Sequence, residues 1–203
     1  MEPFITASGV AAALPQANVD TDQIMPKQFL KGIDRQGLAK GFLFDQRFSA
    51  PGVEKPEFVL NRMPWRRAAI LLTGPNFGCG SSREHAVWGL RELGLRCVIG
   101  TSFGGIFADN CARNGVPAIS IAAEDLDRLM SLALDPTSCE MAVDLEAQVI
   151  TTPADQRVLL FAFDPLRRHM LLNGLDAVGV TLQYADDIAH FEQRHLSAQP
   201  WLA

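Results

Sequence analysis

Apolar residues in this chain gather in short continuous runs that alternate with segments of helical spacing. The runs at residues 68–73, 96–100 and 117–122 are typical of buried strands. Between them, residues 84–93 and 104–113 have the pattern of helices. Such alternation of strand and helix predicts an α/β domain.

The flanking segments extend this pattern at both ends of the chain. Residues 4–14 predict a first strand or strand pair. After the core, residues 124–134 predict a helix and residues 141–163 predict an antiparallel meander. Two closing helices are expected at residues 165–173 and 186–195. Residues 186–203 form the expected C-terminal helix and tail.

One stretch interrupts the regular pattern. Residues 38–66 contain Pro51, Pro56 and Pro64 and predict an insertion or a long loop. No internal repeat divides the chain, so residues 1–203 are interpreted as a single domain.

Composition narrows the classes of protein that fit. The chain has 203 residues, with 48% hydrophobic and 20% charged positions, which suits a globular domain with its own core. A net charge of −5 argues against general nucleic-acid binding. No apolar run approaches the roughly 20 residues of a membrane span, and no basic leader precedes residues 10–14. We expect a cytoplasmic protein that binds neither nucleic acid nor membrane.

The potential metal ligands are widely spaced. Cys79, Cys97, Cys111 and Cys139 form no Cys-x-x-Cys pair, and the four histidines form no His-x-x-x-His pair. We expect free thiols and no metal bound by this chain, with Cys79 the exception to watch because it lies in a glycine-rich loop.

That loop is the strongest chemical signal. The sequence GPNFGCGSSREH at residues 74–85, called the glycine loop below, joins a predicted strand to a predicted helix. Asn76, Gly78 and Gly80 are expected to shape its backbone, while free N–H groups and the helix dipole favour an anion. The guanidinium of Arg83 adds a planar fork suited to a carboxylate. The loop therefore predicts a carboxylate-binding site.

Familiar glycine motifs do not match this loop. A phosphate-binding P-loop would need a lysine that is absent, and Arg83 replaces the last glycine of a dinucleotide fingerprint. Glu84 stands where a nucleophile elbow centred on Ser82 would need glycine. A capping box of Ser81 and Glu84 remains open and is compatible with anion binding.

An acidic cluster, Asn18-x-Asp20-x-Asp22, first suggests calcium. An EF-hand numbered from Asn18 would place Gln23 at the required glycine and Phe29 at the bidentate carboxylate. A calcium loop is thus excluded. Turn formation or N-capping is the simpler interpretation of these residues.

Three segments together resemble a known family. The glycine loop is similar to the signature of the mobile domain in the aconitase superfamily. ANVDTDQIMPKQFL at residues 17–30 and RRHMLLNGLD at residues 167–176 extend the resemblance to the small subunits of bacterial 3-isopropylmalate dehydratases. The resemblance runs from about residue 4 to residue 195 and implies an α/β fold of the swivelling β/β/α type.

The resemblance also implies a reaction and a partner. These enzymes isomerise 2-isopropylmalate to 3-isopropylmalate through isopropylmaleate, in leucine biosynthesis. A [4Fe-4S] cluster on a separate large subunit supplies the Lewis acid. This chain is accordingly expected to bind no cofactor and to act on a small dicarboxylate only in complex with that subunit.

Individual roles follow from the same resemblance. Ser81 matches the catalytic base, acting as an alkoxide, and Ser82 and Arg83 match contacts to the substrate carboxylate. Asp22 matches a carboxylate that pairs with a histidine on the cluster-bearing part. The helix N-terminus and the loop N–H groups would stabilise an oxyanion at Ser81.

Substrate choice is expected to lie after Pro26, where the family places its specificity loop. Phe29 and Leu30 suit an isopropyl group, whereas Lys27 leaves open a homoaconitate-like substrate. Citraconate or methylmalate would also fit, because apolar pockets discriminate poorly between methyl groups. Two other classes stay open: a serine hydrolase using His85, and a non-catalytic carboxylate-binding module.

Overall fold

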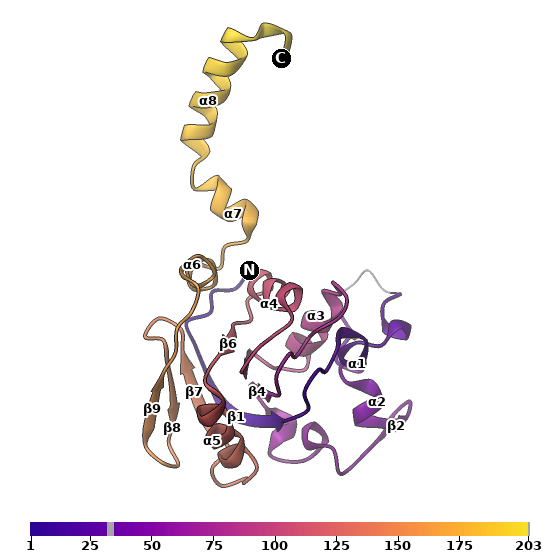
Figure 1. Ribbon diagram of the computed structural model, residues 1–203. Coiled ribbons are helices and arrows are strands. Elements are labelled where there is room, and N and C mark those ends of the chain that lie inside the picture. The colour runs from indigo at the N-terminus through magenta and orange to yellow at the C-terminus, as the bar shows by residue number, and fades with distance from the viewer. Residues whose placement is uncertain (32–34, 203) are drawn as a thin grey trace.

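The computed structural model describes residues 1–31 and 35–202; the end of the expected tail, Ala203, lies outside this range (Figure 1). The strands of the main sheet are β1 (Thr6–Leu14), β4 (Ile70–Thr73), β5 (Cys97–Gly100), β6 (Ala118–Ser120), β7 (Glu140–Asp144), β8 (Val149–Thr152) and β9 (Arg157–Leu160). These seven strands are ordered β6-β5-β4-β1-β7-β8-β9. The predicted α/β fold is confirmed.

Strand β1 joins a parallel half of the sheet to an antiparallel half. Its second part, from Ala11 to Leu14, pairs in parallel with β4. Its first part, from Thr6 to Val10, pairs antiparallel with β7. Residues 4–14 thus contain one long strand and not a strand pair.

Four helices complete the layers: α3 (His85–Glu92), α4 (Gly105–Arg113), α5 (Ala123–Ala133) and α6 (Pro165–Asn173). Alternate residues of the central strands enter two separate cores. Leu71 and Val98 pack with α3 and α4, whereas Ile70 and Leu72 pack with α5 and α6. Because side chains alternate across a strand and both faces are covered, the middle positions of these strands are apolar on both faces.

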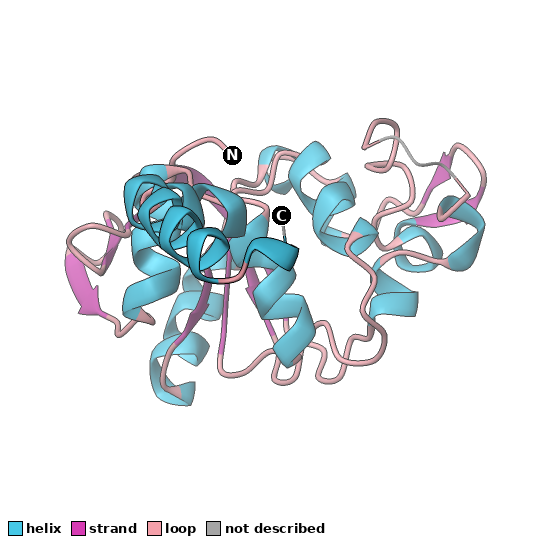
Figure 2. Ribbon diagram, turned by 90° about the horizontal axis from the view of Figure 1, so that it is seen from above, coloured by secondary structure: helices cyan, strands magenta, loops and turns pink. Residues whose placement is uncertain are grey.

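The predicted insertion contains short elements and part of the core. It includes α2 (Phe44–Arg47), the hairpin of β2 (Phe48–Ala50) and β3 (Val53–Glu54), and the 3-10 turns η2 (Val59–Asn61) and η3 (Trp65–Arg67). The hairpin lies well away from the main sheet (Figure 2). Phe42, Leu43 and Leu60 are nevertheless buried in the core under α3.

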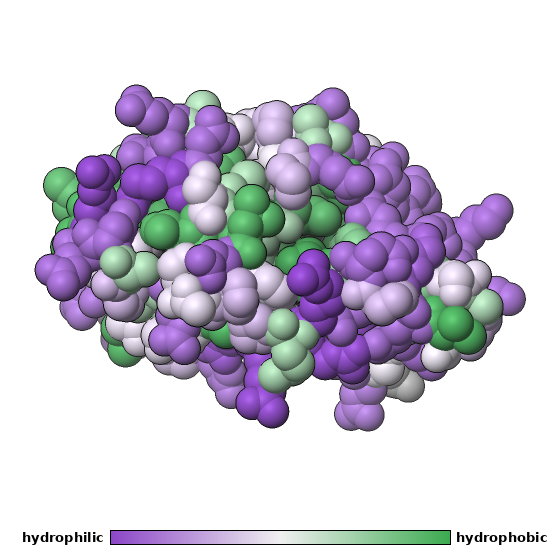
Figure 3. All heavy atoms as spheres, turned by 90° about the horizontal axis from the view of Figure 1, so that it is seen from below, coloured by the Kyte–Doolittle hydropathy of each residue, from purple (hydrophilic) through white to green (hydrophobic). Residues whose placement is uncertain are grey.

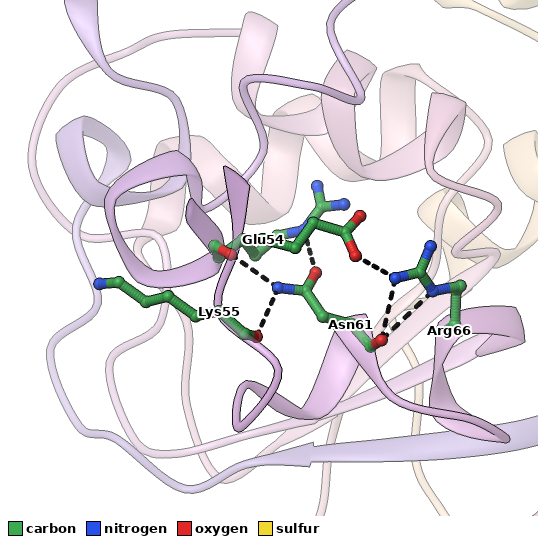
Figure 4. Close-up of polar contacts among 5 residues, drawn as sticks. Glu54, Lys55, Asn61 and Arg66 are labelled. Atoms are coloured by element: carbon green, nitrogen blue, oxygen red, sulfur yellow. Dashed lines mark hydrogen bonds and ion pairs between the residues drawn. The ribbon is translucent and has the colours of Figure 1, made fainter. Parts of the chain in front are cut away.

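A polar network holds this insertion together (Figure 4). The Asn61 side-chain amide donates to the carbonyl oxygens of Arg47, at 2.6 Å, and Lys55, at 3.0 Å. Its Oδ1 accepts from Nε of Arg47 at 3.3 Å. Arg66 pairs with Glu54 and donates to the Asn61 carbonyl. The buried Asn61 therefore satisfies backbone carbonyl oxygens at the base of the β2–β3 hairpin and ties the hairpin to η2.

The C-terminal elements project from the body of the protein (Figure 1). α7 (Ala177–Leu182), which the sequence pattern did not predict, leads into α8 (Ala185–Ala198) and the turn η4 (Pro200–Leu202). Neither of the two helices contains a buried residue. We call residues 177–202 the C-terminal arm.

The lower face of the molecule shows apolar side chains near its centre, bordered by polar ones (Figure 3). Within the described ranges, no helix has both the length and the apolar character to cross a membrane.

Candidate active site

The glycine loop lies against the segment that follows β1. The Gly78 N–H donates to the Val19 carbonyl at 2.8 Å, and the Thr21 N–H donates to the Cys79 carbonyl at 2.9 Å. Asp20 and Cys79 form a parallel β-bridge between these bonds. Two segments nearly 60 residues apart are thus held in register by their backbones.

Asparagine side chains continue this register at one end. Nδ2 of Asn76 donates to Oδ1 of Asn18 at 2.8 Å, and both residues have a left-handed φ of 57°. Asparagine tolerates this conformation better than most residues. The Asn76 N–H also donates to Oγ of Ser102 at 2.9 Å, which ties the loop to the segment after β5.

Glycine is required where the loop passes over α4. Gly78 has φ +74°, and a Cβ there would lie 2.2 Å from Cγ of Phe107. A Cβ on Gly104, just before α4, would lie 2.4 Å from the Gly78 carbonyl oxygen. Gly80 has φ +96° and faces the Thr21 hydroxyl. Gly78 and Gly104 therefore permit a close approach that no side chain allows.

Thr21 is the polar centre of the contact. It is the first residue of α1 (Thr21–Ile24) and is 1% exposed. Its Oγ1 accepts the Ser81 N–H at 3.0 Å and lies 3.0 Å from the Ser81 hydroxyl, which is itself exposed. Sequence reasoning missed Thr21, because a threonine in a polar stretch carries no pattern that reveals burial.

One residue of the acidic cluster at the start of α1, Asp20, has a structural role. Oδ1 of Asp20 accepts the Gln23 N–H at 2.8 Å and caps this short helix. The N-capping interpretation is thus confirmed for Asp20.

The capping box of Ser81 and Glu84 is wrong. Helix α3 begins at His85, and Glu84, in the cap position, forms no side-chain capping bond. The Glu84 carboxylate instead accepts from Nδ2 of Asn114 at 2.7 Å, while the Ser81 hydroxyl meets Thr21. Both side chains are held by residues distant in the sequence, so the local box does not form.

Asp22 and Arg83 meet at the open end of the site. They form an ion pair in which the Arg83 side chain is 25% exposed and that of Asp22 is 62% exposed. Asp22, Ser81 and Arg83 therefore lie together at the surface, with the buried Thr21 beside them. The sequence interpretation assigned the two charges to different partners, a histidine elsewhere and a substrate, and their mutual pairing in this chain was not foreseen.

Two buried amides support the loop from below. Nδ2 of Asn110, which is 6% exposed, donates to the Ser82 carbonyl at 3.3 Å. Asn114, the C-cap residue of α4, accepts from Nε1 of Trp88 at 3.0 Å. The hydroxyl-bearing residue Ser82 is exposed above them. Helix α4 therefore fixes the backbone of the predicted substrate contact.

The predicted specificity residues lie on the 3-10 turn η1 (Lys27–Phe29) and just after it. The Phe29 ring lies 5.0 Å from that of Phe44 and lines a surface hollow of about 580 Å³. Leu30 packs against the core, and Lys27 is exposed. Phe29 thus contacts α2 on one side and borders an open apolar space on the other.

Comparison with known proteins agrees with this geometry. The model of the aconitase C-terminal domain family matches residues 1–124, and a second model, the C-terminal domain of 3-isopropylmalate dehydratase small subunits, matches residues 178–203. Small subunit 2 of this enzyme from Salmonella typhimurium is 51% identical over 202 residues, covering 100% of this chain and 96% of the relative. Small subunit 1 from Mannheimia succiniciproducens is 50% identical, covering 100% of this chain and 99% of the relative. The chain belongs to the 3-isopropylmalate dehydratase small-subunit family.

A solved member of the same family shares the fold. The crystal structure of 3-isopropylmalate dehydratase from Methanocaldococcus jannaschii aligns with a TM-score of 0.65 at 23% identity, covering 94% of this chain and 99% of that one. The α/β architecture implied by the three matching segments is therefore confirmed.

The cysteines of this small-subunit family member do not fit a metal centre. Cys97 and Cys111 are completely buried, and burial raises the pKa of both thiols. Over residues 1–31 and 35–202, no three His, Cys, Asp or Glu side chains gather closely enough to hold a metal ion. The thiolates that an iron–sulfur cluster requires are not offered as a set by these residues.

Proposed function

We propose that this chain is the small subunit of a 3-isopropylmalate dehydratase and works only with a large subunit that carries a [4Fe-4S] cluster. Together they would convert 2-isopropylmalate to 3-isopropylmalate through isopropylmaleate, a step of leucine biosynthesis. The enzyme class follows from relatives about 50% identical over the full chain. The partner, the cofactor and the residue roles below are the proposal.

The observation that carries it is the grouping of Ser81, Arg83 and Asp22 around the buried Thr21. Ser81 is an exposed residue on a glycine loop whose backbone is fixed by two neighbouring segments. A guanidinium lies two residues away and is already oriented by a carboxylate. This arrangement suits proton transfer beside a bound carboxylate.

In the proposal, Ser81 accepts and returns the proton of the substrate carbon. The C–H bond breaks, its electrons stay with the substrate, and the proton moves to the Ser81 alkoxide. A serine hydroxyl is a weak base, so its oxyanion must be stabilised where it forms. The nearby Arg83 charge and the Thr21 hydroxyl supply such stabilisation.

Arg83 and Ser82 hold the substrate carboxylate. A guanidinium can bind a carboxylate with two parallel bonds, which fixes its plane as well as its position. Asp22 occupies part of that fork in this chain. We infer that Asp22 turns to a histidine of the large subunit on assembly, which frees Arg83 for the substrate.

The remaining chemistry belongs to the partner. The leaving hydroxyl needs a Lewis acid, which the [4Fe-4S] cluster supplies when bound. The described cysteines of this chain do not form its ligand set, so we place the cluster on the large subunit.

The substituent of the substrate would be recognised around η1. The apolar hollow beside Phe29 and the neighbouring Leu30 favour an isopropyl group through burial of methyl groups. The cation of Lys27 is exposed at the same turn, and would favour a homologue with an additional carboxylate.

The test mixes this chain with its cognate large subunit, loaded with cluster under anaerobic conditions, and supplies 2-isopropylmalate. Ultraviolet absorbance of the unsaturated intermediate reports turnover. We expect activity only in the mixture, and its loss with Ser81→Ala while the complex still forms by gel filtration. Full activity of that variant would remove Ser81 as the base.

Substrate identity is decided by the same assay. Citraconate and homoaconitate are compared with isopropylmalate at equal concentration. A higher kcat/KM for isopropylmalate supports the assignment, whereas preference for homoaconitate would indicate that Lys27 determines specificity. Absence of a complex would leave the glycine loop as a carboxylate-binding module.

A further inference from the structure

The buried Thr21 hydroxyl is in hydrogen-bond contact with three atoms of one residue. Its Oγ1 accepts the Ser81 N–H at 3.0 Å, lies 3.0 Å from Ser81 Oγ, and lies 3.2 Å from the Ser81 carbonyl oxygen. Gly80, which precedes Ser81, has a left-handed φ of +96° that L side chains rarely adopt, and the loop turns there toward Thr21. Thr21 therefore contacts the backbone and the side chain of the proposed base together.

Counting protons shows how this contact can respond to the charge on Ser81. A hydroxyl has one proton and two lone pairs. The Ser81 N–H occupies one lone pair of Thr21, and the Thr21 proton has two acceptors within reach, the carbonyl and the Oγ of Ser81. A neutral Ser81 can donate to Thr21 while Thr21 donates to the carbonyl. An anionic Ser81 can accept a hydrogen bond from the Thr21 hydroxyl after a rotation of that hydroxyl alone.

We propose that Thr21 is a positioning residue that holds the Ser81 side chain and donates a hydrogen bond to its oxyanion. This inference rests on the proposed role of Ser81 as the base. Thr21 itself neither gains nor loses a proton: the substrate proton moves to Ser81 Oγ, and the Thr21 hydroxyl turns back toward the carbonyl. A donor that is buried and fixed in advance stabilises such an anion without reorganisation.

Other ionisable groups surround the pair. They come from α1 and its cap and from the glycine loop: Asp20, Asp22, Cys79, Arg83, Glu84 and His85. Asp20 is held by its capping bond, Glu84 by Asn114, and Arg83 by Asp22. A substitution at Thr21 changes none of these charges, so a shift in a pH profile reports the loss of the hydroxyl.

The first experiment compares Thr21→Val and Thr21→Ser in the full-length chain assembled with the cluster-loaded large subunit. Valine keeps the shape of threonine without the hydroxyl, and serine keeps the hydroxyl without the methyl group. For Thr21→Val we expect kcat to fall about a hundredfold with KM little changed. The acid limb of the kcat–pH profile should move to higher pH, because an alkoxide without its donor is more basic.

Thr21→Ser should recover most of the kcat that Thr21→Val loses and restore the acid limb. A wild-type kcat and pH profile in Thr21→Val would overturn the proposal. So would an equal loss in both variants, since that would show that retaining the hydroxyl does not preserve turnover and that the packing of the whole side chain matters instead.

A second experiment needs neither the partner nor turnover. Ser81→Cys places a thiol at the same position in the isolated chain, and peptide mass spectrometry follows its alkylation by iodoacetamide against pH. Adding Thr21→Val should move this profile to higher pH by about one pH unit, since a hydrogen bond to a thiolate lowers its pKa. Adding Thr21→Ser should leave the profile in place.

The two experiments separate the inference from the proposed function. The thiol profile of the isolated chain could shift with Thr21→Val while the wild-type mixture shows no turnover. That combination would support the hydroxyl contact and reject the dehydratase. An unshifted thiol profile would overturn the contact even in an active enzyme.

Discussion

Arg83 forms an ion pair with Asp22, 61 positions earlier in the chain. The pair lies at the end of the register that begins at Asn18 and Asn76. Its partners are 25% and 62% exposed, and pairs of such exposure contribute only about 0–1 kcal/mol to stability. The pair therefore orients the guanidinium more than it stabilises the fold, and a competing anion or histidine can replace either partner at small cost.

Asp22→Asn should separate these two effects. We expect the free energy of unfolding, from urea titration, to change by less than about 1 kcal/mol, because the pair is solvent-screened. Turnover of the assembled enzyme should fall about tenfold or more, because an amide cannot stabilise a protonated histidine as a carboxylate does. The matched control is Asp20→Asn, which retains an N-cap. Equal loss of turnover in both variants would argue against a specific role for Asp22.

The strands of the parallel half of the sheet could be predicted from the sequence because each has a local signal. The runs at residues 68–73, 96–100 and 117–122 are confirmed as β4, β5 and β6. These strands are apolar on both faces, so their signal is strong. Helix α7 was missed because it buries no residue. Its sequence therefore carries no apolar stripe of helical spacing.

The site was only partly predictable for a different reason. The glycine loop and Arg83 carry chemistry in their residue types, and the motif locates them without a structure. Thr21, Asn110 and Asn114 act through contacts 26 to 60 residues away in the chain. No period or spacing encodes such a contact, so only the fold reveals these residues.

Gly78→Ala should be strongly destabilising, since two costs combine at this position. A left-handed φ of +74° disfavours any Cβ, and the new Cβ would lie 2.2 Å from the Phe107 ring. We expect the free energy of unfolding to fall by about 3 kcal/mol or more, from about 1–2 for the backbone and 1–3 for overpacking. Denaturant titration of the isolated chain measures this difference.

Two other glycines serve as controls for that substitution. Gly94 has φ +99° with nothing within 4 Å of its Cβ position, so Gly94→Ala reports the backbone cost alone. Gly104 has an ordinary φ of −58° but a close contact with the loop, so Gly104→Ala reports the clash alone. If Gly78→Ala lowered the free energy of unfolding no more than Gly94→Ala does, the loop could not be packed closely against α4.

The Glu92 carboxylate holds the backbone at Gly37 and Ala39, and we expect this interaction to depend on pH. The carboxylate accepts the N–H groups of Gly37 at 2.5 Å and Ala39 at 2.7 Å. Desolvation raises the pKa of Glu92, but the bonds from these groups and from Leu38, with the charge of Lys40, outweigh it, so its pKa lies below the ordinary value. The stabilisation is therefore present above the unfolded pKa and is lost as the pH falls through the lower folded pKa.

Glu92→Gln should consequently be less stable than the wild type at pH 7. The difference should diminish below about pH 4, where the wild-type carboxylate also becomes protonated. Urea titrations of both proteins between neutral and acid pH provide the measurement. The exposed Glu57→Gln is the matched control and should show no such convergence. A difference that stayed constant with pH would assign the effect to packing.

Removal of the C-terminal arm should leave the body of the fold intact. The arm's two helices bury no residue, and their large apolar side chains, including Leu182 and Phe191, are 63% and 57% exposed. A chain ending at residue 176 should melt within about 2 °C of the full chain, since no core area is lost. Circular dichroism melting measures the two midpoints.

A chain ending at residue 164 is the control: it also removes Leu171, which is fully buried and whose carbonyl accepts the Phe4 N–H at 2.8 Å. That chain should melt at least about 5 °C lower, because a buried leucine contributes several kcal/mol. A similar fall on removing the arm alone would show that the arm packs against the body.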